Sequence, residues 1–219
     1  MSTSEMWEEI TTDIKSVNSE QKAVLLRDVP ALKNKKSGKI RVYPAEVAKA
    51  EIRDLANQYG LEPRQIPILL MLFAKPGIFR EGMVHFKYHM NKMLFYQLEE
   101  MRKQKIGETY HHDDFVAAKR GPVPVSLDED LTNLKKLGLV NVTLIPFGKG
   151  KKEASKEIEL TKQGFEISGK LWKQIPEPLR DTTLDVKKDL FPLSTNAIKE
   201  KVHEEYPQYR KMYVEVDLD

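Results

Sequence analysis

The residues that commonly do chemistry in proteins are sparse in this chain, and a pair of histidines is the first candidate. His85 and His89 stand four positions apart, a spacing that places both on one side of a helix and can hold a metal ion. Position 86 is Phe where zinc proteases carry Glu, so the protease pattern fails. Because both histidines lie beside an apolar stripe centred on Met90 and Met101, we expect solvated or boundary histidines rather than metal ligands.

Four further potential ligands follow one another at His111, His112, Asp113 and Asp114. Neighbouring side chains of an extended segment point to opposite sides, so at most two of the four can converge on one ion. A turn or cap role for Asp113 or Asp114 is the simpler expectation. The sequence therefore predicts no metal site.

Signatures of catalysis are missing. The chain has no cysteine, which excludes a cysteine nucleophile, a thiolate zinc site and a disulfide. The glycines Gly148 and Gly150 flank a lysine, but the spacing and the Lys-Ser/Thr ending of a phosphate-binding loop are absent. No nucleophile elbow occurs either. We therefore expect a non-catalytic binding protein that needs no cofactor.

Basic side chains are the remaining candidates for a functional surface. The segment Pro146–Lys156 carries four lysines against the single acid Glu153, and such a loop either contacts phosphate or lies solvated at the surface. Other basic residues precede it in the chain. The nucleic-acid-binding residues expected from this pattern are Lys119, Arg120, Asn133, Lys135, Lys136, Lys149, Lys151, Lys152 and Lys156.

A helix over residues 127–137 is expected to position the middle of that set. Ser126 and Glu129 have the spacing of a capping box, which predicts that the helix begins at Leu127. Gly138 can adopt the left-handed conformation that ends it. The apolar stripe of this helix is Leu127, Leu131, Leu134 and Leu137.

The first turn of the same helix is acidic. Asp128, Glu129 and Asp130 stand at the end that usually enters the major groove in helix-turn-helix proteins. Three carboxylates there would repel phosphate. The sequence thus argues against conventional docking of this helix and favours the basic loop as the DNA contact.

The surrounding elements follow the order of a winged helix. The segment Leu139–Ile145 alternates like a strand, Ile158 and Leu160 mark a returning strand after the basic loop, and Thr161 caps a further helix. An earlier amphipathic helix over 85–103 supplies another apolar stripe. We predict a mainly α fold with a small β-hairpin, a winged-helix-like central unit, and helical extensions at both ends.

The extensions complete the expected domain organisation. The three regions are a helical amino-terminal region docked on the core at 1–80, the winged-helix-like domain at 81–175, and a carboxy-terminal helix and tail at 176–219. Pro176 and Pro178 interrupt helix, so a polar connection is expected over Glu177–Pro192. A last helix begins at Ser194 or Thr195 and stops at Pro207.

Two features of the amino-terminal region bear on function. Helices are expected over Pro44–Tyr59 and Glu62–Phe73, the second apolar all round and so buried, although two helices in tandem would also suit a second helix-turn-helix. The segment Ala31–Arg41 holds five basic residues and no acid, which suits two extended pieces joined by a turn. That turn is either solvated or in contact with phosphate.

Composition limits the choice of partner only loosely. Of the 219 residues, 40% are hydrophobic and 32% are charged, as in an ordinary globular protein, and the net charge of +3 permits a nucleic-acid partner without requiring one. No run approaches the roughly 18 apolar residues of a spanning helix, and the first residues lack the pattern of a signal peptide. A cytoplasmic protein without a membrane partner is expected.

Two segments resemble the Panacea domain, a family of antitoxin-like proteins. The first comprises His89–Met101 followed by the run Phe115–Val123, which resembles the family's F-x-A-x-x-x-G-P-V segment. The second comprises Leu193-Ser194 and Val202–Pro207, which is similar to the family's closing pattern of a cap, a His and a downstream Pro. The resemblance covers about the last 130 residues. Arg120 departs from the family, which often has an aromatic residue there.

The resemblance implies binding of a partner protein. The residues that would form its working surface are Gly121, Pro122, Val123, His203 and Pro207. Our first hypothesis is a DNA-associated transcription regulator that binds double-stranded DNA through the basic loop. The alternative is an antitoxin-like module that binds or neutralises a partner protein, and a homodimer is compatible with both.

Overall fold

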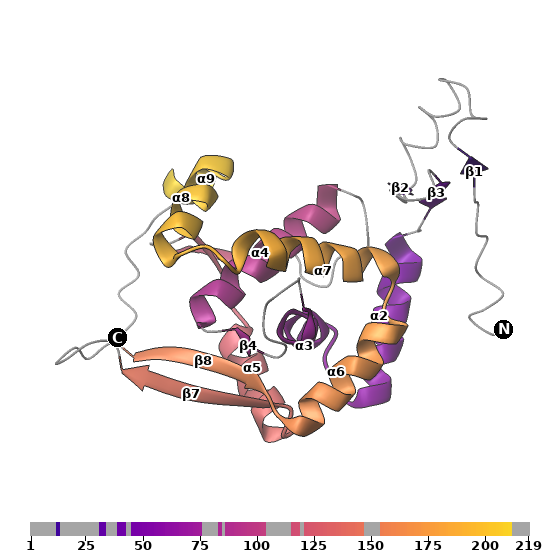
Figure 1. Cartoon of the computed structure of the whole chain (residues 1–219), viewed down its shortest axis with the longest axis horizontal. Helices are drawn as coiled ribbons and strands as arrows, with labels where there is room; N and C mark the ends of the chain where they lie inside the picture. The colour runs from indigo at the N-terminus through magenta and orange to yellow at the C-terminus, as the bar shows by residue number, and fades with distance from the viewer. Residues whose placement is uncertain are drawn as a thin grey trace.

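The computed structural model describes residues 12–13, 31–33, 39–42, 45–75, 83–84, 86–103, 115–118, 121–146 and 154–211. These residues are mainly helical with small antiparallel sheets, which confirms the predicted fold class (Figure 1). The helices are α2 (Ala45–Tyr59), α3 (Gln65–Phe73), α4 (Lys87–Lys103), α5 (Leu127–Lys136), α6 (Lys162–Gln174), α7 (Glu177–Leu190), α8 (Thr195–Glu205) and α9 (Gln208–Lys211). The strands are β1 (Thr12–Asp13), β2 (Ala31–Lys33), β3 (Lys39–Val42), β4 (Met83–Val84), β5 (Phe115–Ala118), β6 (Gly121–Pro124), β7 (Val140–Pro146) and β8 (Ala154–Leu160).

Helix α3 lies at the centre of the helical part, where Figure 1 shows it end-on with other helices around it. Its residues from Ile68 to Leu72 are fully buried, as the apolar sequence predicts. A buried helix cannot enter a DNA groove. The suggestion that α2 and α3 form a second helix-turn-helix reader is therefore wrong. One hydrophobic cluster runs from Ile52 on α2 to Tyr209 on α9.

Three antiparallel sheets accompany the helices. Strands β2 and β3 pair as expected for Ala31–Arg41, and β1 adds to β3. Strands β7 and β8 form the predicted hairpin, with Val140 opposite Leu160, and β4 adds a third strand through Val84 opposite Ile158. The sequence did not predict the β5–β6 hairpin.

Helix α5 begins at Leu127 as predicted, but the capping box is wrong. Ser126 has helical dihedral angles (φ −84°, ψ −7°), and its buried hydroxyl has no hydrogen-bond partner. A capping side chain reaches the amides of the first turn only from an extended residue, so Ser126 cannot act as one. Leu137 is 44% exposed because the chain leaves the helix there, through Gly138 at φ +71°.

Helix α6 packs directly on the start of β7. Its predicted cap is confirmed, since the Thr161 hydroxyl accepts a hydrogen bond from the Gly164 amide at 2.9 Å. The Thr161 amide donates to the Leu139 carbonyl at 3.0 Å. A Cβ atom on Gly164 would lie 1.9 Å from the same carbonyl oxygen. Glycine at this position is therefore what lets α6 approach the β7 backbone.

The polar connection predicted over Glu177–Pro192 is wrong, because Glu177–Leu190 is helix α7. Its first turn contains Pro178, and a proline in that turn removes no intrahelical hydrogen bond. The helix is amphipathic, with Leu179, Thr183, Val186 and Leu190 buried. The helical spacing of these four residues indicates a helix, but Pro176 and Pro178 led to the prediction of a break.

Lys187 of α7 is fully buried and caps the end of α3. Its amine donates to the carbonyl oxygens of Met71 and Ala74, both at 2.6 Å, and lies 3.4 Å from that of Leu72. These carbonyls have no partner within their own helix, so a cation there satisfies them and complements the helix dipole. Burial nevertheless lowers the pKa of Lys187 to about 8.

Helix α8 follows the prediction. Ser194 caps it by accepting a hydrogen bond from the Ala197 amide at 3.3 Å, and the helix ends before Pro207. Ile198 and Val202 point into the core. None of the helices among the described residues is long and apolar enough to cross a membrane.

Candidate nucleic-acid interface at helix α5 and the β7–β8 hairpin

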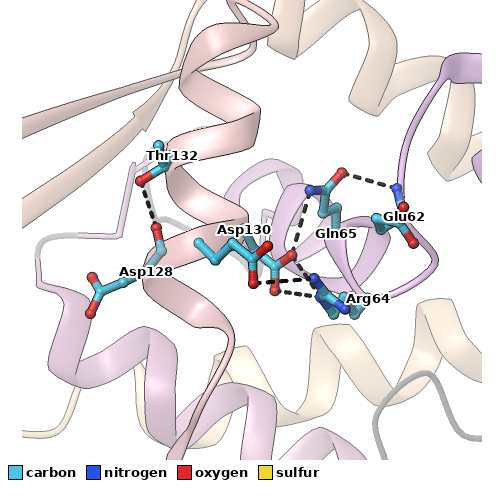
Figure 2. Close-up of polar contacts among 7 residues, drawn as sticks. Glu62, Arg64, Gln65, Asp128, Asp130 and Thr132 are labelled. Atoms are coloured by element: carbon cyan, nitrogen blue, oxygen red, sulfur yellow. Dashed lines mark hydrogen bonds and ion pairs between the residues drawn. The ribbon is translucent and has the colours of Figure 1, made fainter.

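Asp130 of α5 is buried in an ion pair with Arg64, which precedes α3. The guanidinium Nε lies 2.8 and 3.1 Å from the two carboxylate oxygens, and the Gln65 amide adds a contact at 3.5 Å (Figure 2). Asp130 is 0% exposed, whereas Arg64 reaches solvent at its edge. The hydrogen bond from Arg64 to Asp130 raises the pKa of the guanidinium above its ordinary value. Asp130 is therefore an anchor of α5 on α3.

The Asp128 carboxylate pairs with two lysines. Lys156 of β8 lies 2.8 Å from one carboxylate oxygen, and Lys87 of α4 contacts the other. Partial burial opposes the charge on Asp128, but the hydrogen bonds from both lysines outweigh it and lower the pKa of the carboxyl. The backbone carbonyl of Asp128 accepts a further hydrogen bond from the Thr132 hydroxyl at 2.8 Å (Figure 2).

Glu129 is the remaining acid of the first turn. Its side chain is 70% exposed and lies 3.7 Å from the Arg64 guanidinium. All three first-turn carboxylates thus have a cation within ion-pair distance. The expectation that this end of α5 repels phosphate was based on the acids of the helix alone. With Arg64, Lys87 and Lys156 included, three cations balance the three carboxylates.

The predicted phosphate-contacting residues are distributed unevenly. Lys135 and Lys136 lie exposed in the last turn of α5, and Asn133 is half-buried beside them. Lys156 is held in the ion pair with Asp128, so its charge is partly neutralised. Five of the predicted residues lie outside the described part of the chain: Lys119, Arg120, Lys149, Lys151 and Lys152.

The residues predicted from the family resemblance are mostly packed. Gly121 and Pro122 are buried, Val123 and His203 are half-buried, and Pro207 is exposed. Gly121 has φ +93°, and a Cβ atom on it would lie 2.8 Å from the Val202 side chain of α8. Gly121 and Pro122 therefore join β6 to α4 and α8 and do not form an open working surface.

Lys92 of α4 is a buried residue that the sequence analysis missed. Its amine donates to the Pro122 carbonyl at 2.6 Å and lies 5.1 Å from the centre of the Tyr88 ring. The side chain is 0% exposed, and burial lowers its pKa to about 7. A lysine within the apolar run of α4, between Met90 and Met93, was the signal that could have found it.

One face of the β5–β6 hairpin is apolar and open to solvent. Phe115, Pro122 and Pro124 turn towards the core, whereas Val116 of β5 is 50% exposed and Val125, in the turn just after β6, is 66% exposed. Val123 lies opposite Val116 on the outward face. Exposed apolar side chains that gather on one face are typical of protein contacts.

The histidines do not form a metal site in the described residues. His89 is 8% exposed, and its Nε2 lies 3.0 Å from the Leu193 carbonyl oxygen, a packing role at the end of the core. His85 and the segment His111–Asp114 lie outside the described residues. Where side chains are described, no three His, Asp or Glu residues gather as ligands.

Comparison of the sequence with protein-family models gives no match, and comparison with curated proteins gives none either.

Proposed function

We propose that this protein is a cytoplasmic, non-catalytic regulator that associates with double-stranded DNA through a winged-helix-like unit. Helix α5, the β7–β8 hairpin and α6 follow in the order typical of that unit, and β4 adds a third strand. The observation that carries the proposal is the pairing of every first-turn acid of α5 with Arg64, Lys87 or Lys156. This pairing removes the main electrostatic obstacle to a phosphate backbone beside α5.

The first turn of α5 with its partners is neutral, and the charges beyond it are mostly positive. Lys87 and Lys156 share Asp128, whereas Arg64 is shared by Glu129 and Asp130, so three cations balance three carboxylates. Lys135 and Lys136 are exposed at the other end of α5. The sequence between β7 and β8 carries three more lysines and one acid. Phosphates that follow the hairpin would meet cations at each of these places.

A DNA titration tests the proposal. We expect a fluorescently labelled duplex of mixed sequence to bind tightly at low salt and weakly near physiological salt, because binding releases counterions. Changing Lys149, Lys151 and Lys152 together to Ala should weaken binding and flatten the slope of log K against log salt by about 2 to 3. Fluorescence anisotropy measures both quantities.

The matched control removes the same charge elsewhere. Lys170, Lys173 and Lys188 are exposed on α6 and α7, and their joint change to Ala lowers the net charge equally. This control should keep most of the affinity and the salt slope. If the wild-type protein does not bind duplex DNA even at low salt, the proposal fails.

A second candidate, an antitoxin-like module that binds a partner protein, is favoured by the exposed valine face of the β5–β6 hairpin. We expect the changes Val116→Asp and Val125→Asp to abolish binding of a protein that co-purifies with the wild type, while circular dichroism stays unchanged. Both side chains point to solvent, so the fold should tolerate the charges. The control Phe165→Asp alters an exposed apolar residue of α6 that packs beside Phe73. Equal loss of the partner in that control would contradict the assignment.

A further inference from the structure

Strand β7 forms one edge of the β4–β8–β7 sheet, and no other strand of the described residues pairs with that edge. Figure 1 shows β7 along the lower margin of the molecule, on the side of the hairpin that faces away from α4 and α7. The strand has seven residues, whereas β4 at the other edge of the sheet has two. An unpaired edge presents a row of backbone amides and carbonyls that can pair with a further strand.

The β7 edge lacks the features that usually prevent such pairing. Its sequence from Val140 to Pro146 contains no charged residue, although 32% of the chain is charged. Strand β8, which lies between β4 and β7, carries Lys156, Glu157 and Glu159. Natural edge strands are commonly protected by lysine, by an internal proline or by a bulge. In β7 the proline stands at the last position, and the register with β8 runs without a bulge along the whole strand.

Apolar side chains become exposed along β7. Val140 at its start is buried, Val142 is half-buried, and Leu144 on the same side of the strand is 62% exposed. This end of the strand therefore leaves apolar surface and backbone hydrogen-bonding groups in water together. A further strand beside β7 would cover part of both, and covering the apolar part is favourable.

The sequence of β7 fits a second copy of itself. When two β7 strands meet antiparallel about a two-fold axis at Thr143, this threonine faces its own copy, and Leu144 faces Val142 of the second copy. Opposed threonines stabilise a strand pair, whereas like charges directly opposite destabilise it. An uncharged strand brings no like charges together when it meets itself, and it carries no charge that would select a foreign strand. A two-fold contact of this kind also closes after two chains and does not continue into a fibre.

We propose that this protein forms a homodimer through antiparallel pairing of two β7 edges, which joins the two three-stranded sheets into one continuous sheet with Thr143 at the two-fold axis. The contact uses the backbone edge of β7 and does not depend on DNA binding.

Sedimentation velocity of the full chain without DNA tests the proposal. We expect the wild type to sediment as a dimer at high protein concentration and as a monomer on dilution. The change Thr143→Lys places two ammonium groups opposite each other at the axis, so the dissociation constant of the dimer should rise at least about tenfold. Thr143 is exposed and faces Glu157 within its own hairpin, so the monomer should tolerate the lysine.

A charge-swap experiment tests the position of the axis. Thr143→Glu should also be monomeric, whereas an equimolar mixture of the Lys and Glu variants should dimerise, because opposite charges then meet at the axis. The glutamate faces Glu157 in its own hairpin, so circular dichroism must show that this variant folds. A mixture of folded variants that stays monomeric would overturn the pairing at Thr143.

The control Gln58→Lys adds the same charge at an exposed position of α2. It should dimerise within about twofold of the wild type. Equal weakening in this control and in Thr143→Lys would show that total charge decides the association, which would overturn the proposal.

Hydrogen exchange locates the contact without the glutamate variant. Amides of β7 should exchange more slowly at high than at low protein concentration in the wild type, and should lose this dependence in Thr143→Lys. Amides of α8 should show no such dependence in either protein. A wild type that stays monomeric at every concentration would overturn the proposal. So would a dimer that persists in Thr143→Lys, or one that leaves the exchange of β7 unchanged.

Discussion

The change Gly164→Ala should destabilise the protein by about 4 kcal/mol, among the largest effects expected of a single methyl group. The new Cβ would lie 1.9 Å from the Leu139 carbonyl oxygen, a contact that only a shift of backbone can relieve. Because the Thr161 amide donates to that same carbonyl, moving α6 outward also weakens its amino-terminal connection to β7. Urea denaturation followed by circular dichroism measures the loss.

Gly169, in the same helix, is the natural control. A Cβ atom there would meet only the Phe73 ring at 3.5 Å, an ordinary van der Waals contact. Alanine is the better helix former by about 1 kcal/mol, so Gly169→Ala should be neutral or stabilising. Similar losses in the two variants would show that helix propensity or general crowding, and not the contact with Leu139, decides the outcome.

Raising the pH from 7 to 9 should stabilise the wild-type protein by about 3 kcal/mol through its two buried lysines. Burial lowers the pKa of Lys92 to about 7 and that of Lys187 to about 8, from 10.5 in the unfolded chain. At pH values between the folded and the unfolded pKa of each lysine, the unfolded chain binds more protons than the folded chain does. The free energy of unfolding therefore rises with pH in this range. The rise begins near pH 7 and ends as the pH approaches 10.5.

The variant Lys92→Met with Lys187→Met isolates this effect. It should lose most of the rise between pH 7 and 9, as measured by urea denaturation at both values. The control variant Lys170→Met with Lys173→Met alters exposed lysines of α6 and should keep the rise. If the double substitution at 92 and 187 prevents folding, each single variant should lose its own share of the rise, the larger from Lys92. A rise that survives both single changes would contradict the assignment.

Local sequence signals predicted the individual helices and strands well where the chain follows simple rules. The start of α5 at Leu127, the cap at Thr161, the cap at Ser194 and the β7–β8 hairpin all appear where propensity and periodicity placed them. These features depend on residues within a few positions of each other. Such short-range interactions can be read from spacing alone.

The failures occurred where local signals compete. Pro176 and Pro178 suggested a break, but proline at the start of a helix costs no hydrogen bond, and the apolar spacing of α7 prevailed. Ser126 has the sequence of a cap, but it takes a helical conformation and its hydroxyl is buried. Neither outcome could be decided without knowing what packs on these residues.

By itself, the sequence determined a mainly helical chain with a basic hairpin loop, a buried α3, and no thiol chemistry, because these follow from composition and from contacts between near neighbours. Only the tertiary structure decided which charges remain available. Arg64 before α3, Lys87 of α4 and Lys156 of β8 meet the acids of α5, and Lys92 and Lys187 reach carbonyls of β6 and α3. Electrostatic partners are chosen by distance in space, which residue spacing along the chain does not encode.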